Sequence, residues 1–83
     1  MAIRRSLHSR EYAEFLTMLR RVREDAGMTQ GDLAVKMGQT QTYVSKCERG
    51  QRRVDIIELR AFCRAIGIDI DRFLRLLDAQ GRH

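Results

Sequence analysis

Apolar residues recur along the chain at the three- and four-residue spacing of amphipathic helices, in five consecutive segments. The first segment spans roughly residues 9–26, and its apolar positions form one stripe: Tyr12, Phe15, Leu16, Leu19 and Val22. This spacing puts side chains on the same face of a helix at every turn. No segment alternates between apolar and polar residues with the period of two that a half-buried strand shows. The pattern therefore predicts five helices and no strand.

Each of the four later segments begins with a residue that can cap a helix. The second spans 29–37, the third spans about 41–49, and the fourth and fifth begin near positions 55 and 69. The capping candidates are Thr29, Thr40, Asp55 and Asp69, and acids stand three residues after the first and third of them, at Asp32 and Glu58. A side-chain oxygen at the N-cap accepts a backbone N–H bond, and an acid three residues later can return one.

A glycine follows each of the five segments, and apolar residues mark the side of each helix that is predicted to face inward. Glycine is the usual residue just past a helix end, since it enters the left-handed region at no steric cost. The glycines that follow segments are Gly27, Gly38, Gly50, Gly67 and Gly81. The positions predicted to face inward in the second, third and fourth helices are Leu33, Ala34, Met37, Val44, Cys47, Leu59, Phe62, Cys63 and Ile66. The fifth helix carries Phe73, Leu74, Leu76 and Leu77.

The chain of 83 residues has room for one domain. We expect a flexible N-terminal segment at residues 1–8, a compact all-α five-helix domain at 9–79, and a C-terminal tail at 80–83. Only Gly38, Gln39 and Thr40 separate the second and third helices. This short glycine turn is typical of a helix-turn-helix, which would occupy about residues 29–49.

Positive charge is concentrated on the third helix and its flanks. The formal net charge is +5, and the stretch from Lys36 to Arg53 holds five cations and one anion. The rest of the chain holds 11 cations and 10 anions, so almost all of the excess lies on this stretch. A focused basic patch is typical of a protein that binds a polyanion, although charge alone fits a solvated face equally well.

Four uncharged polar residues, Gln39 to Thr42, form the end of the short glycine turn and the start of the third helix. In a helix-turn-helix the second helix enters the DNA major groove, with its first residues at the base edges. Gln can bond adenine twice, Thr can contact a thymine methyl, and Lys can bond guanine. Arginines beside the helix would then contact phosphates and fix the register.

Several other functions lack support in the sequence. No apolar run approaches the ~18 residues of a membrane span, and the start MAIRRSLHSR has no apolar region typical of a signal peptide. We therefore expect a cytoplasmic protein, bacterial or phage and associated with the nucleoid, with no membrane partner. We expect no enzyme activity, no cofactor and no small-molecule ligand. Cys47 and Cys63 fit small buried side chains, with a redox switch or half of a metal site as the alternatives.

A family resemblance rests on a run of these residues. The stretch MTQGDLAVKMGQTQTYVSKCERGQRRVDIIELRAFCRAIGI resembles the Cro/CI-type (XRE-like) helix-turn-helix family, which has the lambda repressor-like fold. The part TYVSKCERGQRRVDIIEL resembles the controller proteins of restriction–modification systems. The resemblance implies a transcriptional regulator or repressor that binds double-stranded DNA as a homodimer, with the helix of residues 41–49 in the major groove of a palindromic operator. An antitoxin-like interaction module and a thiol-based redox sensor are the alternative functions.

The resemblance also implies roles for individual residues. Those expected to read bases are Gln41, Thr42, Ser45 and Lys46, and those expected to contact phosphates are Gln30, Thr40, Tyr43, Arg49, Arg52 and Arg53. For Tyr43 a half-buried core position is the alternative. Gln30 would also brace the reading helix, and Arg23 and Glu48 would form an ion pair.

The fifth helix carries more apolar residues than one buried face needs, and the start of the fourth shows the same surplus. The expected homodimer interface therefore consists of Ile56, Ile70, Leu74 and Leu77. The alternative is that these residues all belong to the core and that the dimer forms only on DNA.

Overall fold

The computed structural model describes residues 9–81, and this part of the chain folds into five α-helices without a strand. The helices are α1 (Arg10–Asp25), α2 (Gln30–Met37), α3 (Gln41–Glu48), α4 (Ile56–Ile66) and α5 (Ile70–Gly81). The all-α prediction is confirmed. The predicted flexible segment 1–8 and the last two residues of the predicted tail lie outside the described residues. Among residues 9–81, no helix has the length and apolar character of a bilayer span.

The helix starts follow the capping chemistry read from the sequence. Thr29 Oγ1 accepts the backbone N–H of Asp32 at 3.0 Å, and Asp32 Oδ2 accepts that of Thr29 at the same distance. The backbone hydrogen bond from Thr29 holds the pKa of Asp32 below its usual value. Asp55 and Glu58 make the same reciprocal pair at the start of α4, at 2.8 and 2.9 Å. These local bonds explain why the chain enters both helices where the sequence predicts.

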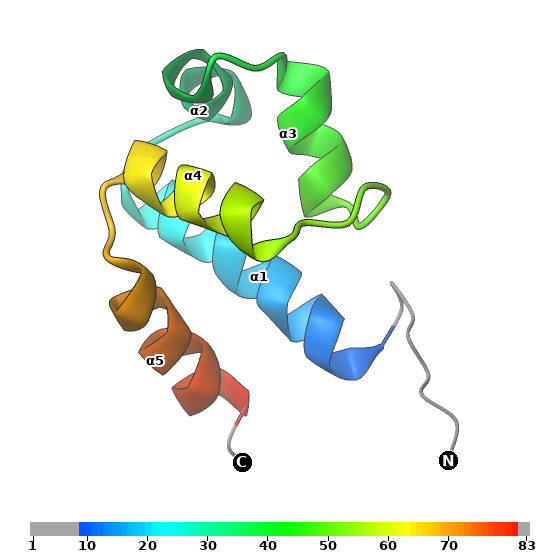
Figure 1. The fold of residues 1–83 in the computed structure, drawn as a ribbon, viewed down its shortest axis with the longest axis vertical. Coiled ribbons are helices and arrows are strands. Elements are labelled where there is room, and N and C mark those ends of the chain that lie inside the picture. The colour runs from blue at the N-terminus through cyan, green and yellow to red at the C-terminus, as the bar shows by residue number, and fades with distance from the viewer. Residues whose placement is uncertain (1–8, 82–83) are drawn as a thin grey trace.

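The turn between α2 and α3 depends on Gly38, which has φ 67° and ψ 32°. This left-handed conformation favours glycine because it has no Cβ to clash with the backbone. The turn changes the direction of the chain within three residues and lets the N–H of Gln39 reach the carbonyl of Ala34 at 2.9 Å. As a result, α3 starts directly beside α2, and its first residues project from the end of the domain (Figure 1).

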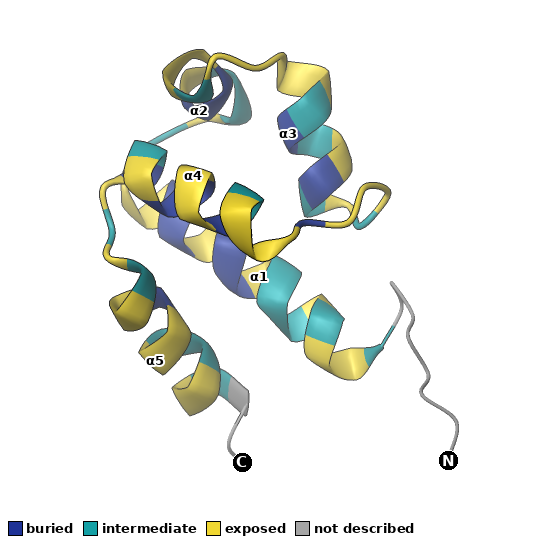
Figure 2. Ribbon diagram, viewed as in Figure 1, coloured by how far each residue is buried: buried dark blue, intermediate teal, exposed yellow. Residues whose placement is uncertain are grey.

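The core takes buried side chains from all five helices: α1 packs against α3 and α5, and α4 packs against α2 and α5. The helices α2 and α3 lie at one end of the fold and α5 lies at the other (Figures 1 and 2). The fully buried side chains of the core include Leu19, Leu33, Val44, Phe62 and Phe73. Of the positions predicted to face inward in α2, α3 and α4, only Met37 is half-buried rather than buried. The single stripe predicted for the first helix missed Met18, which is buried. The helix α1 packs against both α3 and α5, so its buried surface is wider than one stripe.

The C-terminal end of the fold differs from the prediction. The sequence predicts that the domain ends at residue 79 and that Gly81 follows the last helix, whereas α5 continues through Gly81. The side chain of Gln80 explains the extra length, because its Nε2 donates to the carbonyl of Glu14 in α1 at 3.0 Å. This bond fastens the last turn of α5 to α1.

Candidate nucleic-acid interface

The helix α3 presents one polar face to solvent and one apolar face to the core. Gln41, Thr42 and Lys46 are exposed and Ser45 is half-buried, whereas Val44 and Cys47 are fully buried. The apolar side chains fix the rotation of the helix about its axis. The four predicted base-reading residues therefore share the outer surface of α3, with Gln41 and Thr42 in its first turn.

Gln41 also lies close to the start of α2. Its side-chain oxygen is 3.7 Å from the position that a Cβ would take on Gly31. A Cβ there would make only an ordinary van der Waals contact with the Gln41 amide, so the space beside Gln41 does not require a glycine at position 31.

A buried ion pair fastens the end of α3 to the end of α1. Arg23 Nε and Nη2 donate to the two carboxylate oxygens of Glu48 at 2.6 and 3.0 Å. The side chains are only 7% and 4% exposed, so the ion pair expected from the family resemblance is present and lies in the interior. Hydrogen bonding to Glu48 raises the pKa of Arg23 above its usual value. Arg23 Nη1 also donates to the carbonyl of Met28 at 2.7 Å, so the guanidinium spans three segments of the chain.

Gln30 joins this network from the first turn of α2. Its Nε2 donates to Glu48 Oε1 at 3.0 Å, and the residue is half-buried. The bond couples the first helix of the motif to the end of the second. It is the bracing contact that the resemblance implied for Gln30.

The predicted phosphate contacts lie around the two ends of α3. At its start, Thr40 is exposed and its Oγ1 accepts the N–H of Tyr43 at 3.1 Å. At its end, exposed Arg49 donates to Gln51 Oε1 at 3.1 Å. The guanidinium of Arg53 lies 4.7 Å from the ring centroid of Tyr12, an arrangement typical of a cation–π contact.

Tyr43 and Arg52 both contact Glu58, a residue that is not among the site residues expected from the sequence. The ring of Tyr43 is half-buried and stacks on Phe62 with centroids 6.2 Å apart. Its hydroxyl donates to Glu58 Oε2 at 3.3 Å. Arg52 forms an ion pair with the same oxygen, and its guanidinium lies 5.1 Å from the ring centroid of Tyr43. Burial raises the pKa of Tyr43 to about 12, so its hydroxyl keeps its proton at neutral pH.

Glu58 was predicted only as the acid of a capping box, because that role follows from a local three-residue spacing. Its second carboxylate oxygen binds Tyr43 and Arg52, which are 15 and 6 residues away in sequence. No periodic pattern reports such a contact. In the sequence, the only indication of these contacts is that Glu58 follows closely after a strongly basic stretch.

Both cysteines lie in the core. Cys47 is 0% and Cys63 is 2% exposed, both are free thiols, and burial raises the pKa of each. Within residues 9–81, no group of three or more His, Cys, Asp or Glu side chains is placed to hold a metal ion. The geometry matches that of small buried side chains.

The predicted interface residues divide into two classes. Ile56 is 57% and Leu74 is 42% exposed, whereas Ile70 and Leu77 are half-buried and pack against the core. Ile56 lines a hollow with Phe15 of α1. The ring centroid of Phe15 lies 5.9 Å from that of Phe73, the residue before Leu74 in α5. Ile57 is 63% exposed next to Ile56, and Val35 on α2, which the sequence did not single out, is 80% exposed.

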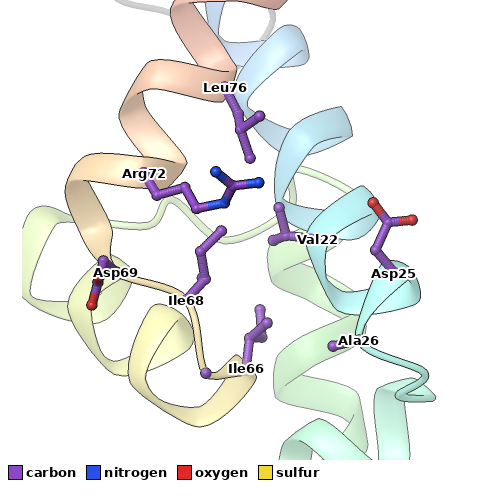
Figure 3. A pocket seen from close by; sticks show the side chains of 9 residues that line it. Val22, Asp25, Ala26, Ile66, Ile68, Asp69, Arg72 and Leu76 are labelled. Carbon is purple, nitrogen blue, oxygen red and sulfur yellow. The ribbon is translucent and has the colours of Figure 1, made fainter.

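A separate hollow of about 370 Å³ lies between α1, the α4–α5 turn and α5 (Figure 3). Arg72 and the carboxylates of Asp25 and Asp69 lie around an apolar lining that includes Val22 and Leu76. None of the residues predicted to contact DNA or a second copy of the chain lines it. The candidate site is therefore the outward face of α3 with its flanking turns, and it does not involve this hollow.

Comparison with known proteins agrees with this geometry. The profile of a helix-turn-helix family matches residues 19–73. A solved XRE-family like protein from Pseudomonas syringae pv. tomato str. DC3000 superposes with a TM-score of 0.81 at 41% identity, covering 92% of this chain and 93% of that one.

The wild-type restriction–modification controller protein C.Esp1396I superposes with a TM-score of 0.81 at 28% identity, over 87% of this chain and 94% of the other. The tetramer of that protein in complex with its natural 35 base-pair operator gives a TM-score of 0.80 at 28% identity, over 87% and 95% of the two chains.

A curated relative from Sinorhizobium fredii (strain NBRC 101917 / NGR234) is described as an uncharacterized HTH-type transcriptional regulator, y4dJ. It is 35% identical over 48 residues, which make up 58% of this chain and 62% of the relative. The match therefore spans less than two thirds of that protein's length.

Proposed function

The chain belongs to the helix-turn-helix family, and on that premise we propose that it is a sequence-specific regulator of transcription that binds double-stranded DNA. The observation that carries the proposal is the outward face of α3. Its apolar residues are fully buried, yet its first turn exposes Gln41 and Thr42, and Lys46 follows one turn later. Side chains that donate and accept hydrogen bonds at an exposed helix start suit the major groove.

In the proposed complex, α3 enters the major groove and its outer face reads the bases. Gln41, Thr42, Ser45 and Lys46 contact base edges, while Gln30, Thr40, Arg49 and Arg53 contact phosphates on either side. The buried ion pair of Arg23 with Glu48 and the bond from Gln30 support this role, because they hold α3 rigidly against α1 and α2. A rigid reading helix loses little conformational entropy when it binds.

We further propose that the chain acts as a homodimer on a palindromic operator. One short reading helix contacts too few base pairs to single out an operator in a genome. Two-fold pairing places two reading helices one turn of DNA apart, about 34 Å. The exposed side chains of Ile56, Ile57 and Leu74 support a self-association surface outside α3. A controller protein of similar fold assembles as a tetramer on its operator.

Gln41→Ala and Lys46→Ala should each reduce the discrimination between operator and random duplex DNA by roughly 1–3 kcal/mol, because each removes a bond to a base edge. Arg53→Ala should weaken binding to both kinds of DNA about equally, because a phosphate contact carries no sequence information. The operator would first be selected from a random duplex library. A gel-shift competition between the two DNAs then gives the ratio of dissociation constants for each variant.

All three substituted side chains are exposed, so the folded state should persist in each variant. Circular dichroism of the free variants verifies this before binding is measured. If Gln41→Ala and Arg53→Ala changed the ratio of the two dissociation constants by the same factor, the division into base-reading and phosphate-binding residues would be wrong.

Binding to any duplex should weaken steeply as salt is added, because cations that contact phosphates release counterions. Each such contact adds roughly 0.9 to the slope of log K against log salt concentration. Arg49→Ala should therefore lower the slope by about 0.9 per protomer, as measured by fluorescence anisotropy with a labelled duplex over a salt series.

The matched control is Arg75→Ala on α5, since this exposed arginine pairs with Asp71 on the same helix and lies outside the candidate site. It removes one positive charge and should leave the slope unchanged. Equal slopes for the wild type and Arg49→Ala would remove Arg49 from the set of phosphate contacts.

A further inference from the structure

The carboxylate of Glu58 binds three segments of the chain at once. One oxygen accepts the backbone N–H of Asp55 at 2.9 Å and completes the cap of α4. The other oxygen accepts the hydroxyl of Tyr43 at 3.3 Å and the guanidinium of Arg52. The side chain of Glu58 is 21% exposed and that of Arg52 is 48% exposed, so the cluster lies at the surface beside the end of α3.

These bonds occupy donors that a DNA phosphate would also use. A tyrosine hydroxyl has a single proton, and the proton of Tyr43 is directed at Glu58. The guanidinium of Arg52 is paired with the same carboxylate, and one of its faces lies against the Tyr43 ring. A carboxylate and a phosphate are both anionic oxygen acceptors that arginine binds through the same donors.

We propose that Glu58 is an internal competitor of the DNA backbone: its carboxylate occupies the place of a phosphate on Tyr43 and Arg52 and thereby lowers the affinity of the chain for DNA of any sequence. This inference rests on the proposed function. Phosphate contacts supply most of the non-specific affinity of a DNA-binding protein. A residue that withholds two of them weakens binding to random DNA without touching a base edge, and so sets the level of non-specific binding.

The proposal separates Arg52 from the other arginines of the basic stretch. Arg49 pairs only with the neutral amide of Gln51, and Arg53 lies over the ring of Tyr12. Neither forms an ion pair with a carboxylate within residues 9–81. Among these three arginines only Arg52 is paired with a carboxylate, and so it releases no counterion until the pair with Glu58 opens.

The experiment measures the affinity and salt dependence of binding to a random-sequence duplex for the wild type and for Glu58→Gln. Glutamine keeps the capping box of α4, because Gln can fill the same position as Glu there. It removes the charge that competes with phosphate. We expect binding to become about tenfold tighter, as for one new hydrogen bond to a charged group, and the salt slope to rise by about 0.9 per protomer.

Arg52→Ala is measured in both backgrounds. In the wild type it should leave the slope unchanged, whereas in Glu58→Gln it should remove the whole gain in slope, because Arg52 is the cation of the cluster. The measurement of Arg52→Ala in the wild-type background keeps Glu58 in place, so it tests the proposal even if Glu58→Gln folds poorly. Asp25→Asn at the end of α1 is the charge control, because Asp25 is exposed and lies outside the candidate site and the proposed interface, so the same loss of one negative charge there should leave the slope unchanged.

Two results would overturn the proposal while leaving the proposed function intact. One is a salt slope that is the same for the wild type and Glu58→Gln. The other is a slope that falls by about 0.9 per protomer for Arg52→Ala in the wild type, since Arg52 would then contact phosphate beside Glu58. If neither the wild type nor Glu58→Gln binds duplex DNA, the proposed function fails and the competition fails with it.

Discussion

Glu48→Gln is expected to lower the free energy of unfolding by about 3 kcal/mol, a large share of the stability of a domain of this size. Glu48 is 4% exposed at the side chain and holds the equally buried Arg23 through two hydrogen bonds. Glutamine preserves the shape but leaves the guanidinium charge without its buried anion, and only the exposed carboxylate of Glu24 remains nearby, at 3.9 Å. Urea unfolding followed by circular dichroism gives the loss as a shift of the midpoint at unchanged slope.

Glu24→Gln is the matched control. Glu24 also lies near Arg23, at 3.9 Å, but its side chain is 52% exposed, so its charge is screened by water. Its replacement should cost less than about 1 kcal/mol. Similar losses for the two variants would show that the burial of the Arg23–Glu48 pair contributes nothing beyond a surface contact.

Leu74→Glu should convert the proposed homodimer to a monomer and weaken operator binding by roughly 10²-fold to 10⁴-fold, the gain that two linked half-sites can give. Leu74 is 42% exposed on α5, so a glutamate there remains solvated in the monomer. In a two-fold interface the substitution introduces a charge on both sides of the contact. Sedimentation velocity over a dilution series measures the association, and gel shift measures operator binding.

Val35→Glu is the control for this experiment, since Val35 is an even more exposed apolar residue, at 80%, and lies on α2 outside the proposed interface. It should leave self-association unchanged. A wild type that sediments as a monomer at tens of micromolar would favour the alternative that the dimer forms only on DNA. A Leu74→Glu dimer of undiminished stability would move the interface elsewhere on the surface.

The fold could be predicted from the sequence because its determinants are local. The pairs Thr29–Asp32 and Asp55–Glu58 act over three residues, and Gly38 sets a turn through its own backbone conformation. Such signals are read directly from spacing. The end of α5 was missed because it depends on a bond between Gln80 and Glu14, which are 66 residues apart in sequence.

The candidate site was only partly predictable for the same reason. The exposed polar start of α3 follows from its local pattern, and the ion pair of Arg23 with Glu48 was expected only through the family resemblance. The contacts that modify the site join distant segments: Arg53 with Tyr12, and Glu58 with Tyr43 and Arg52. Charge counting treats all these cations as equivalent, whereas their partners in the fold make them different.

The burial of Cys47 and Cys63 makes the two thiols internal reporters of unfolding. Cys47 is 0% and Cys63 is 2% exposed, and burial keeps both protonated at neutral pH. A thiol reagent or oxidant reacts with the thiolate and needs access to the sulfur, so it modifies these residues only during transient opening of the core. The rate of labelling therefore measures the population of open molecules. Oxidant sensitivity in this protein would follow its conformational stability, and a variant such as Glu48→Gln should label faster without any change in cysteine chemistry.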